Sequence, residues 1–156
     1  MGLIDFVRSA GAKLFGADEA AAAPATDAGV QSKRAGALEE HVRSLGLAVE
    51  DLKIKVADHL AVVKGRVATQ ADAEKVILAV GNTTGIGQVD DRLEVTNPEP
   101  EAVYYTVVAG DNISKIAKSQ YGDANKYPAI FEANKPMLKH PDKIYPGQVL
   151  RIPPLS

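Results

Sequence analysis

The first sixteen residues show an amphipathic pattern. Apolar side chains recur every three or four positions, at Leu3, Val7, Ala10 and Leu14, and charged residues fall between them. This spacing predicts a helix over residues 1–16. The same charges interrupt the continuous apolar run that a secretory signal needs, so we expect a cytoplasmic protein. Three roles for the helix stay open: packing on its own domain, a contribution to a ligand site, and binding to a membrane surface, which its thin basic face disfavours.

The next residues change from an irregular segment to regular elements. Residues 17–32 show no sustained period and contain Pro24 and Gly29, which predicts a linker. Residues 33–95 then predict the order helix, strand, strand, helix, strand. The two helices end near Gly46 and Gly81, where glycine caps are expected. The alternation of apolar and lysine positions in LKIKV begins a hairpin. We therefore expect a small α+β domain whose helices cover one face of a sheet.

A second unit follows a stiff connection. Residues 96–103 contain Pro98 and Pro100 and predict a short linker. Residues 104–156 predict the order strand, helix, helix, strand around a small core. A chain of 156 residues accommodates two domains of this size. The predicted fold class is therefore α+β, with two small domains.

Composition narrows the classes of function. The formal net charge is −2, and no cluster of lysine and arginine interleaves with aromatics, so no nucleic-acid partner is expected. The absence of cysteine removes disulfides, thiolate metal sites and thiol nucleophiles. His41, His59 and His140 fall in separate predicted elements, with no metal-ligand spacing and no nucleophile beside them. With no nucleophile elbow or phosphate-binding loop either, the chain is not expected to be an enzyme.

The C-terminal unit carries family motifs. The segments YTVVAGDNISKIAKSQYG, IFEANKP and IYPGQVLRIP resemble the LysM module, whose members bind N-acetylglucosamine-containing glycans in a shallow groove. Carried over by this resemblance, the groove would use Gly110, Asp111, Asn112, Ile113, Asn134, Pro136 and Ile144. Asn112 departs from the family, in which Thr or Ser is commoner. The alternative is structural, because Gly110 and Asp111 also suit a turn and a helix start.

The N-terminal unit resembles a second family. Gly81, Gly85 and the segment IGQVDDRLEV within residues 33–95 are similar to the BON domain of bacterial envelope proteins. The BON–LysM order, the opening MGLIDFVRSAGAKL and the segment IFEANKPMLKHPDKIYPGQVLRIP together resemble the bacterial BON–LysM potassium-binding proteins. That resemblance covers nearly the whole chain and implies a cytoplasmic K⁺ sensor.

Physical chemistry suggests where such an ion would bind. Potassium is large and singly charged, so a selective site replaces its water with several neutral oxygens. The last carbonyls of a helix lack partners inside it and carry the negative end of the dipole. Glycines after Gly81 would let the backbone fold closely around an ion. The predicted K⁺ ligands are the backbone carbonyls of Val7, Ala10, Gly81, Asn82, Thr84 and Ile86.

Simpler interpretations remain beside this one. Gly81 suits a plain helix cap, and Gly85 and Gly87 suit a turn. If K⁺ does bind there, we expect it to order the N-terminal segment and the glycine loop and to fix an intramolecular BON–LysM contact. The alternative function is a peptidoglycan-binding envelope adaptor that uses the LysM groove.

Overall fold

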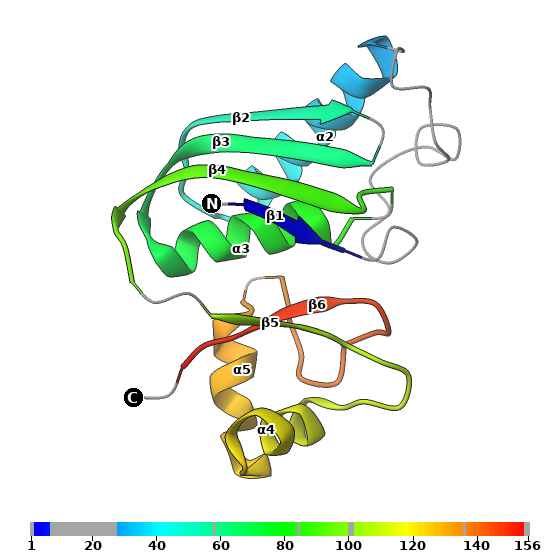
Figure 1. Ribbon diagram of the computed structural model, residues 1–156, viewed down its shortest axis with the longest axis vertical. Helices are drawn as coiled ribbons and strands as arrows, with labels where there is room; N and C mark the ends of the chain where they lie inside the picture. The colour runs from blue at the N-terminus through cyan, green and yellow to red at the C-terminus, as the bar shows by residue number, and fades with distance from the viewer. Residues whose placement is uncertain are drawn as a thin grey trace.

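A computed structural model shows the α+β architecture and describes residues 2–6, 28–57, 59–83, 85–99, 102–135 and 137–154. The chain forms an N-terminal unit with a four-stranded sheet and a C-terminal unit with a two-stranded sheet (Figure 1). The α+β fold class expected from the sequence is confirmed. Within the described ranges, no helix has the length and apolar character needed to cross a membrane.

The N-terminal unit contains two helices and four strands. They are β1 (Gly2–Asp5), α2 (Ala28–Ser44), β2 (Glu50–Ala57), β3 (Leu60–Thr69), α3 (Gln70–Gly81) and β4 (Gln88–Asn97). The sheet order is β1-β4-β3-β2, with β3 and β4 parallel and the other pairs antiparallel. Helix α3 makes the crossover between the parallel strands. Thr69 is the N-cap of this helix, and its hydroxyl accepts a 3.1 Å hydrogen bond from the Asp72 N–H.

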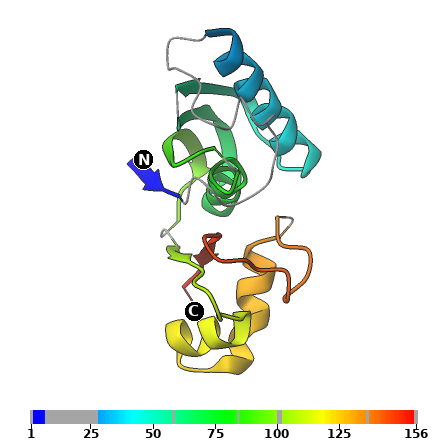
Figure 2. The same cartoon turned by 90° about the vertical axis from the view of Figure 1, so that its right-hand side faces the viewer.

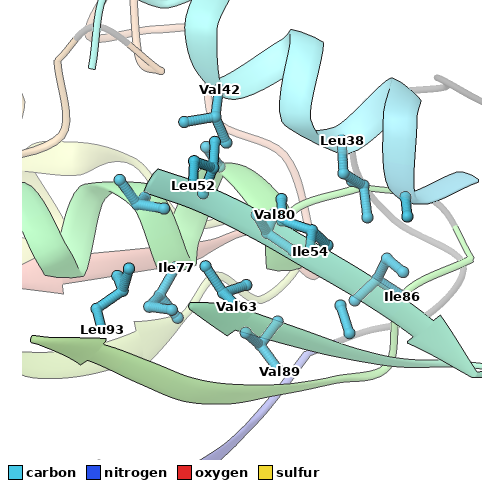
Figure 3. Close-up of a cluster of buried hydrophobic side chains, with 14 of the residues drawn as sticks. Leu38, Val42, Leu52, Ile54, Val63, Ile77, Val80, Ile86, Val89 and Leu93 are labelled. Carbon is cyan, nitrogen blue, oxygen red and sulfur yellow. The ribbon is translucent and has the colours of Figure 1, made fainter. Parts of the chain in front are cut away.

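The core of this unit lies between the sheet and its helices. Buried and exposed residues alternate along β2, so only one face of the sheet is covered. Leu38 and Val42 of α2 point toward that face, and Ile77 and Val80 of α3 belong to the same cluster (Figure 3). The prediction that helices cover one face is confirmed.

The N-terminal segment differs from the helix expected there. Gly2–Asp5 form a strand rather than the beginning of a helix, and Leu3 pairs with Asp90 and Ile4 with Val89. The helix predicted over residues 1–16 is therefore wrong at its start, because the edge of β4 supplies backbone hydrogen bonds that local periodicity cannot reveal. Phe6 is described and is not helical, and residues 7–16 of that predicted helix lie outside the described residues. The predicted linker 17–32 is also wrong at its end, since α2 begins at Ala28 and tolerates a glycine in its first turn.

The C-terminal unit has the predicted order of strand, helix, helix, strand. It contains β5 (Val103–Thr106), α4 (Ile113–Tyr121), a short 3₁₀ turn (Ala124–Lys126), α5 (Tyr127–Ala133) and β6 (Val149–Ile152). Strands β5 and β6 are antiparallel. Strand β6 lies on the side of the unit that faces α3, and α4 lies on the far side (Figures 1 and 2). The second core is separate from the first and is formed chiefly by Val107, Ile113, Ile116, Ile130, Leu138 and Leu150.

Candidate functional site

The loop that follows α3 is the centre of the candidate site. The Asn82 N–H donates to the Leu78 carbonyl at 2.8 Å, and the Thr83 hydroxyl donates to the Ala79 carbonyl at 3.2 Å. The Ile86 N–H then donates to the Thr83 carbonyl at 3.0 Å. These bonds use carbonyls that the helix end would otherwise leave without partners and hold the loop against α3.

Loop carbonyls divide into two groups by their hydrogen bonding. The Gly85 carbonyl accepts from Arg34 Nη2, and the Gly87 carbonyl accepts from the Phe6 N–H, both at 3.0 Å. By contrast, the carbonyls of Gly81, Asn82 and Ile86 accept no hydrogen bond from a described residue. Gly81 and Ile86 are buried. Neutral oxygens that are buried and not hydrogen-bonded are suited to coordinate a cation.

The N-terminal segment packs directly on this loop. Strand β1 pairs with β4, and the next residue, Phe6, donates its N–H to Gly87 and lays its ring against Gly81. A Cβ atom at Gly81 would overlap that ring, so glycine is required for the close approach. The structure thus brings the chain start beside three of the six predicted K⁺ ligands. The other three, Val7, Ala10 and Thr84, lie outside the described residues.

A buried arginine lies beside the loop. Arg34 is 1% exposed and places its guanidinium on the Gly85 carbonyl. In the described part of the chain, no three His, Asp or Glu side chains form a group that could hold a metal ion.

Asn82 also connects the loop to the C-terminal unit. Its side-chain Nδ2 donates to the Val149 carbonyl at 2.8 Å, and its Oδ1 accepts from the Val149 N–H at 2.9 Å. The side-chain amide of Asn82 therefore makes two hydrogen bonds with the Val149 backbone, as the backbone of a neighbouring strand would. One residue thus presents a backbone carbonyl to the candidate site and holds the second unit with its side chain.

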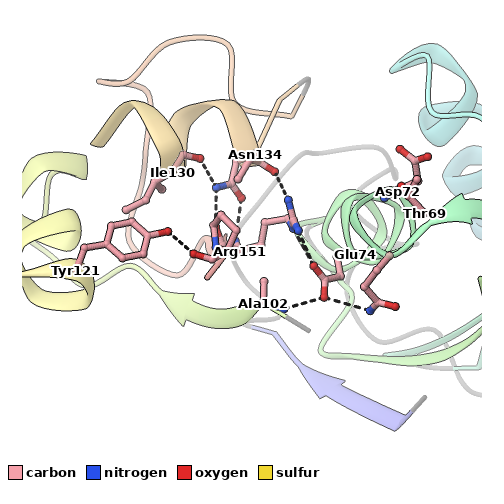
Figure 4. A network of polar contacts seen from close by, with 11 residues as sticks. Thr69, Asp72, Glu74, Ala102, Tyr121, Ile130, Asn134 and Arg151 are labelled. Carbon is pink, nitrogen blue, oxygen red and sulfur yellow. Dashed lines mark hydrogen bonds and ion pairs between the residues drawn. The ribbon is translucent and has the colours of Figure 1, made fainter. Parts of the chain in front are cut away.

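A buried ion pair supports the same contact. Glu74 of α3 is 2% exposed, and its Oε1 accepts from Arg151 Nη2 at 2.7 Å and from Nε at 3.0 Å (Figure 4). Its other oxygen accepts from the Ala102 N–H at 3.0 Å and from Gln70 at 3.2 Å. The carboxylate is therefore satisfied on both oxygens, as a buried charge must be. Sequence reasoning missed this pair, although an arginine within the apolar strand VLRI was a signal for it.

The residues carried over for a glycan groove have mixed roles. Asn112 is the N-cap of α4, and its side chain accepts from the Lys115 N–H at 2.8 Å. Asp111 accepts from the Tyr105 hydroxyl at 2.6 Å and from the Val108 N–H at 3.0 Å. The Tyr105 hydrogen bond, followed by the backbone one, lowers the pKa of the Asp111 carboxyl.

The remaining groove residues are mostly internal. Ile113 is buried in the second core, against which Ile144 packs. Asn134 is buried and bonds the carbonyls of Ile130 and Arg151 and the Arg151 N–H. Gly110 is exposed with φ 89°, and Pro136 lies outside the described residues. The described members therefore include several that already serve the fold, and only Gly110, Asp111 and Asn112 lie on one open loop.

Known proteins resemble this chain in both units. The BON domain model matches residues 26–97, and the LysM domain model matches residues 105–153. The chain is 46% identical over 154 residues to a protein of Escherichia coli named "Potassium binding protein Kbp", a match that covers 98% of this chain and 99% of the relative. An uncharacterized protein of Deinococcus radiodurans is 51% identical over 49 residues, 31% of this chain and 19% of its own length. An esterase of Mycobacterium tuberculosis is 47% identical over 53 residues, which cover 34% of this chain and 11% of the esterase.

Proposed function

The chain belongs to the BON–LysM family that includes the Escherichia coli potassium binding protein, and from that membership we propose that it binds potassium. The observation that carries the proposal is the loop after α3, where the carbonyls of Gly81, Asn82 and Ile86 accept no hydrogen bond from a described residue. We propose these three, together with the carbonyls of Val7, Ala10 and Thr84, as the ligands.

The chemistry of this loop fits the ion. Backbone carbonyls are neutral, so several of them can surround K⁺ without the mutual repulsion that carboxylates would suffer. The negative end of the α3 dipole adds a favourable potential at the same place. The proposed site therefore selects by the type of oxygen that it offers.

We propose further that K⁺ changes the contact between the two units. An ion held by the Asn82 carbonyl restrains the same residue whose side chain bonds Val149 on β6. Binding therefore favours the arrangement in which β6 is docked on α3, because the ion stabilises only the loop conformation that coordinates it. The expected result is a more compact molecule in potassium than in its absence.

Calorimetric titration of the full chain tests the binding. KCl is expected to give saturable heat, and NaCl at the same ionic strength much less. Gly81→Ala should weaken K⁺ binding at least tenfold, because the new Cβ displaces the Phe6 ring. Gly36→Ala is the matched control, since a Cβ there meets nothing within 4 Å, and its K⁺ affinity should be unchanged. Absence of K⁺ heat in the unmodified chain, or equal affinity in both variants, would refute the site.

A glycan-binding role is the second candidate. The LysM match and the open loop Gly110 to Asn112 favour it. Co-sedimentation with purified peptidoglycan tests it: retention of the chain that is lost in Asn112→Tyr, while K⁺ binding is unchanged, would support a separate glycan function. No retention of the unmodified chain would exclude it.

A further inference from the structure

A cleft between the two units carries chemistry that the proposed potassium site does not use. It has a volume of about 330 Å³, which is the size range of small-molecule sites. One wall comes from α2 and α3 and includes His41 and Leu78. The other wall comes from the loop between α5 and β6 and includes Met137, Lys139, Lys143 and Tyr145. Of the seven residues carried over for the glycan groove, none of the six that the structure describes lines it.

The described charged residues that line this cleft are both lysines. Lys139 and Lys143 contribute two ammonium groups, and neither forms an ion pair with a described residue. Among the described residues that line the cleft, none is Asp or Glu. The whole chain has a formal net charge of −2, whereas the described residues that line the cleft carry two positive charges and no carboxylate. Such a cleft attracts anions.

The other residues that line the cleft indicate what a ligand would contain besides its negative charge. Leu45, Leu78, Ala79 and Met137 supply an apolar floor. Burial raises the pKa of Tyr145 to about 12, so its hydroxyl stays a neutral donor at neutral pH. Burial also lowers the pKa of His41, which leaves that imidazole uncharged at neutral pH. The cleft thus combines a cationic rim with apolar surface and a few neutral polar groups.

From this combination we infer that the cleft binds a small organic phosphate with a flat apolar or aromatic body, such as a nucleoside monophosphate. A phosphate monoester carries a charge between −1.5 and −2 at neutral pH, which two lysine ammoniums match. The ring lies on the Leu78 and Met137 side. Because both units line the cleft and Asn82 is part of its wall, a bound molecule bridges them directly.

The test uses the full chain and AMP as the probe, in choline chloride buffer so that potassium is absent. Calorimetry should show AMP binding at a 1:1 ratio, and amide chemical shifts should change at His41, Met137 and Tyr145. Lys139→Gln/Lys143→Gln should weaken AMP binding at least tenfold. Lys118→Gln/Lys126→Gln, which removes two exposed lysines of the same unit that do not line the cleft, should leave it unchanged.

Comparator ligands separate the two parts of the inference. Adenosine and inorganic phosphate should each bind at least tenfold more weakly than AMP. Adenosine lacks the negative charge, and inorganic phosphate lacks the ring. Equal binding of AMP to both double variants, equal affinity for AMP and phosphate, or no AMP binding at all would overturn the inference. A failure of this kind with normal K⁺ titration would leave the proposed potassium function intact.

Discussion

Replacing Glu74 by alanine removes the carboxylate on which the contact between α3 and β6 depends. The carboxylate accepts two hydrogen bonds from Arg151 and one from the Ala102 N–H. Arg151 is only 8% exposed, so its guanidinium would be left buried without a counter-charge. Removing one partner of such a buried pair costs about 3–5 kcal/mol. Separation of the units would let water reach Arg151, so part of this cost should appear as loss of the contact between the units.

Glu132→Ala provides the matched control. Glu132 and Lys135 form an ion pair of nearly the same length, 2.8 Å against 2.7 Å, but both side chains are exposed to solvent. An exposed pair of this kind contributes about 0–1 kcal/mol. The difference between the two variants therefore isolates the effect of burial from the effect of distance.

Urea unfolding followed by two signals reads out the contact. All five tyrosines lie between residues 104 and 145 and the chain has no tryptophan, so tyrosine fluorescence reports the C-terminal unit and, through Tyr145, the cleft between the units. Far-UV circular dichroism reports both units. The two curves should coincide in the unmodified chain and separate in Glu74→Ala, with the C-terminal unit unfolding at a different urea concentration. Coincident curves with a loss no larger than that of Glu132→Ala would refute the reasoning.

Three further predictions follow from particular contacts. Asn82→Ala removes both hydrogen bonds to Val149 and should cost about 1–3 kcal/mol in urea unfolding while also weakening K⁺ binding in calorimetry; unchanged values for both would contradict the proposed coupling. Asp111 has a lowered pKa in the folded state, so its stabilisation is complete above the unfolded value of about 3.9 and is lost as the pH falls from there through the folded value. Asp111→Asn should flatten that acid dependence in tyrosine-detected unfolding, and a dependence equal to the unmodified chain would exclude this carboxyl as its source. Asn112→Ala should cost about 1 kcal/mol, measured the same way, because α4 loses its cap, and a neutral result would show that the cap contributes nothing.

Local patterns predicted the parts of the fold that depend on nearby residues. The helix from Gln70 to Gly81 follows from its capping threonine and its terminal glycine, both visible in the sequence. Strand β1 was missed because the residues of β4 that pair with it lie 83 to 89 positions further along the chain. Glu74 and Arg151 were missed for the same reason, since each alone reads as an isolated charge.

The candidate loop shows a similar division. Glycine spacing and the end of a helix indicated where backbone oxygens could gather. The sequence could not show which loop carbonyls already accept a hydrogen bond, because the donors, Arg34 and Phe6, are far away in the sequence. The structure supplies that information and separates Gly85 and Gly87 from Gly81, Asn82 and Ile86.

The pairing of β1 with β4 has a consequence for synthesis on the ribosome. Gly2 pairs with Asp91, so 89 more residues must be synthesised after Gly2 before its partner exists. At translation rates of about 5–20 residues per second, that delay is roughly 4–18 s. Until Gly81 and Gly87 have also been synthesised, Phe6 cannot make its contacts with them, so the loop stays incomplete whatever the salt in the cell.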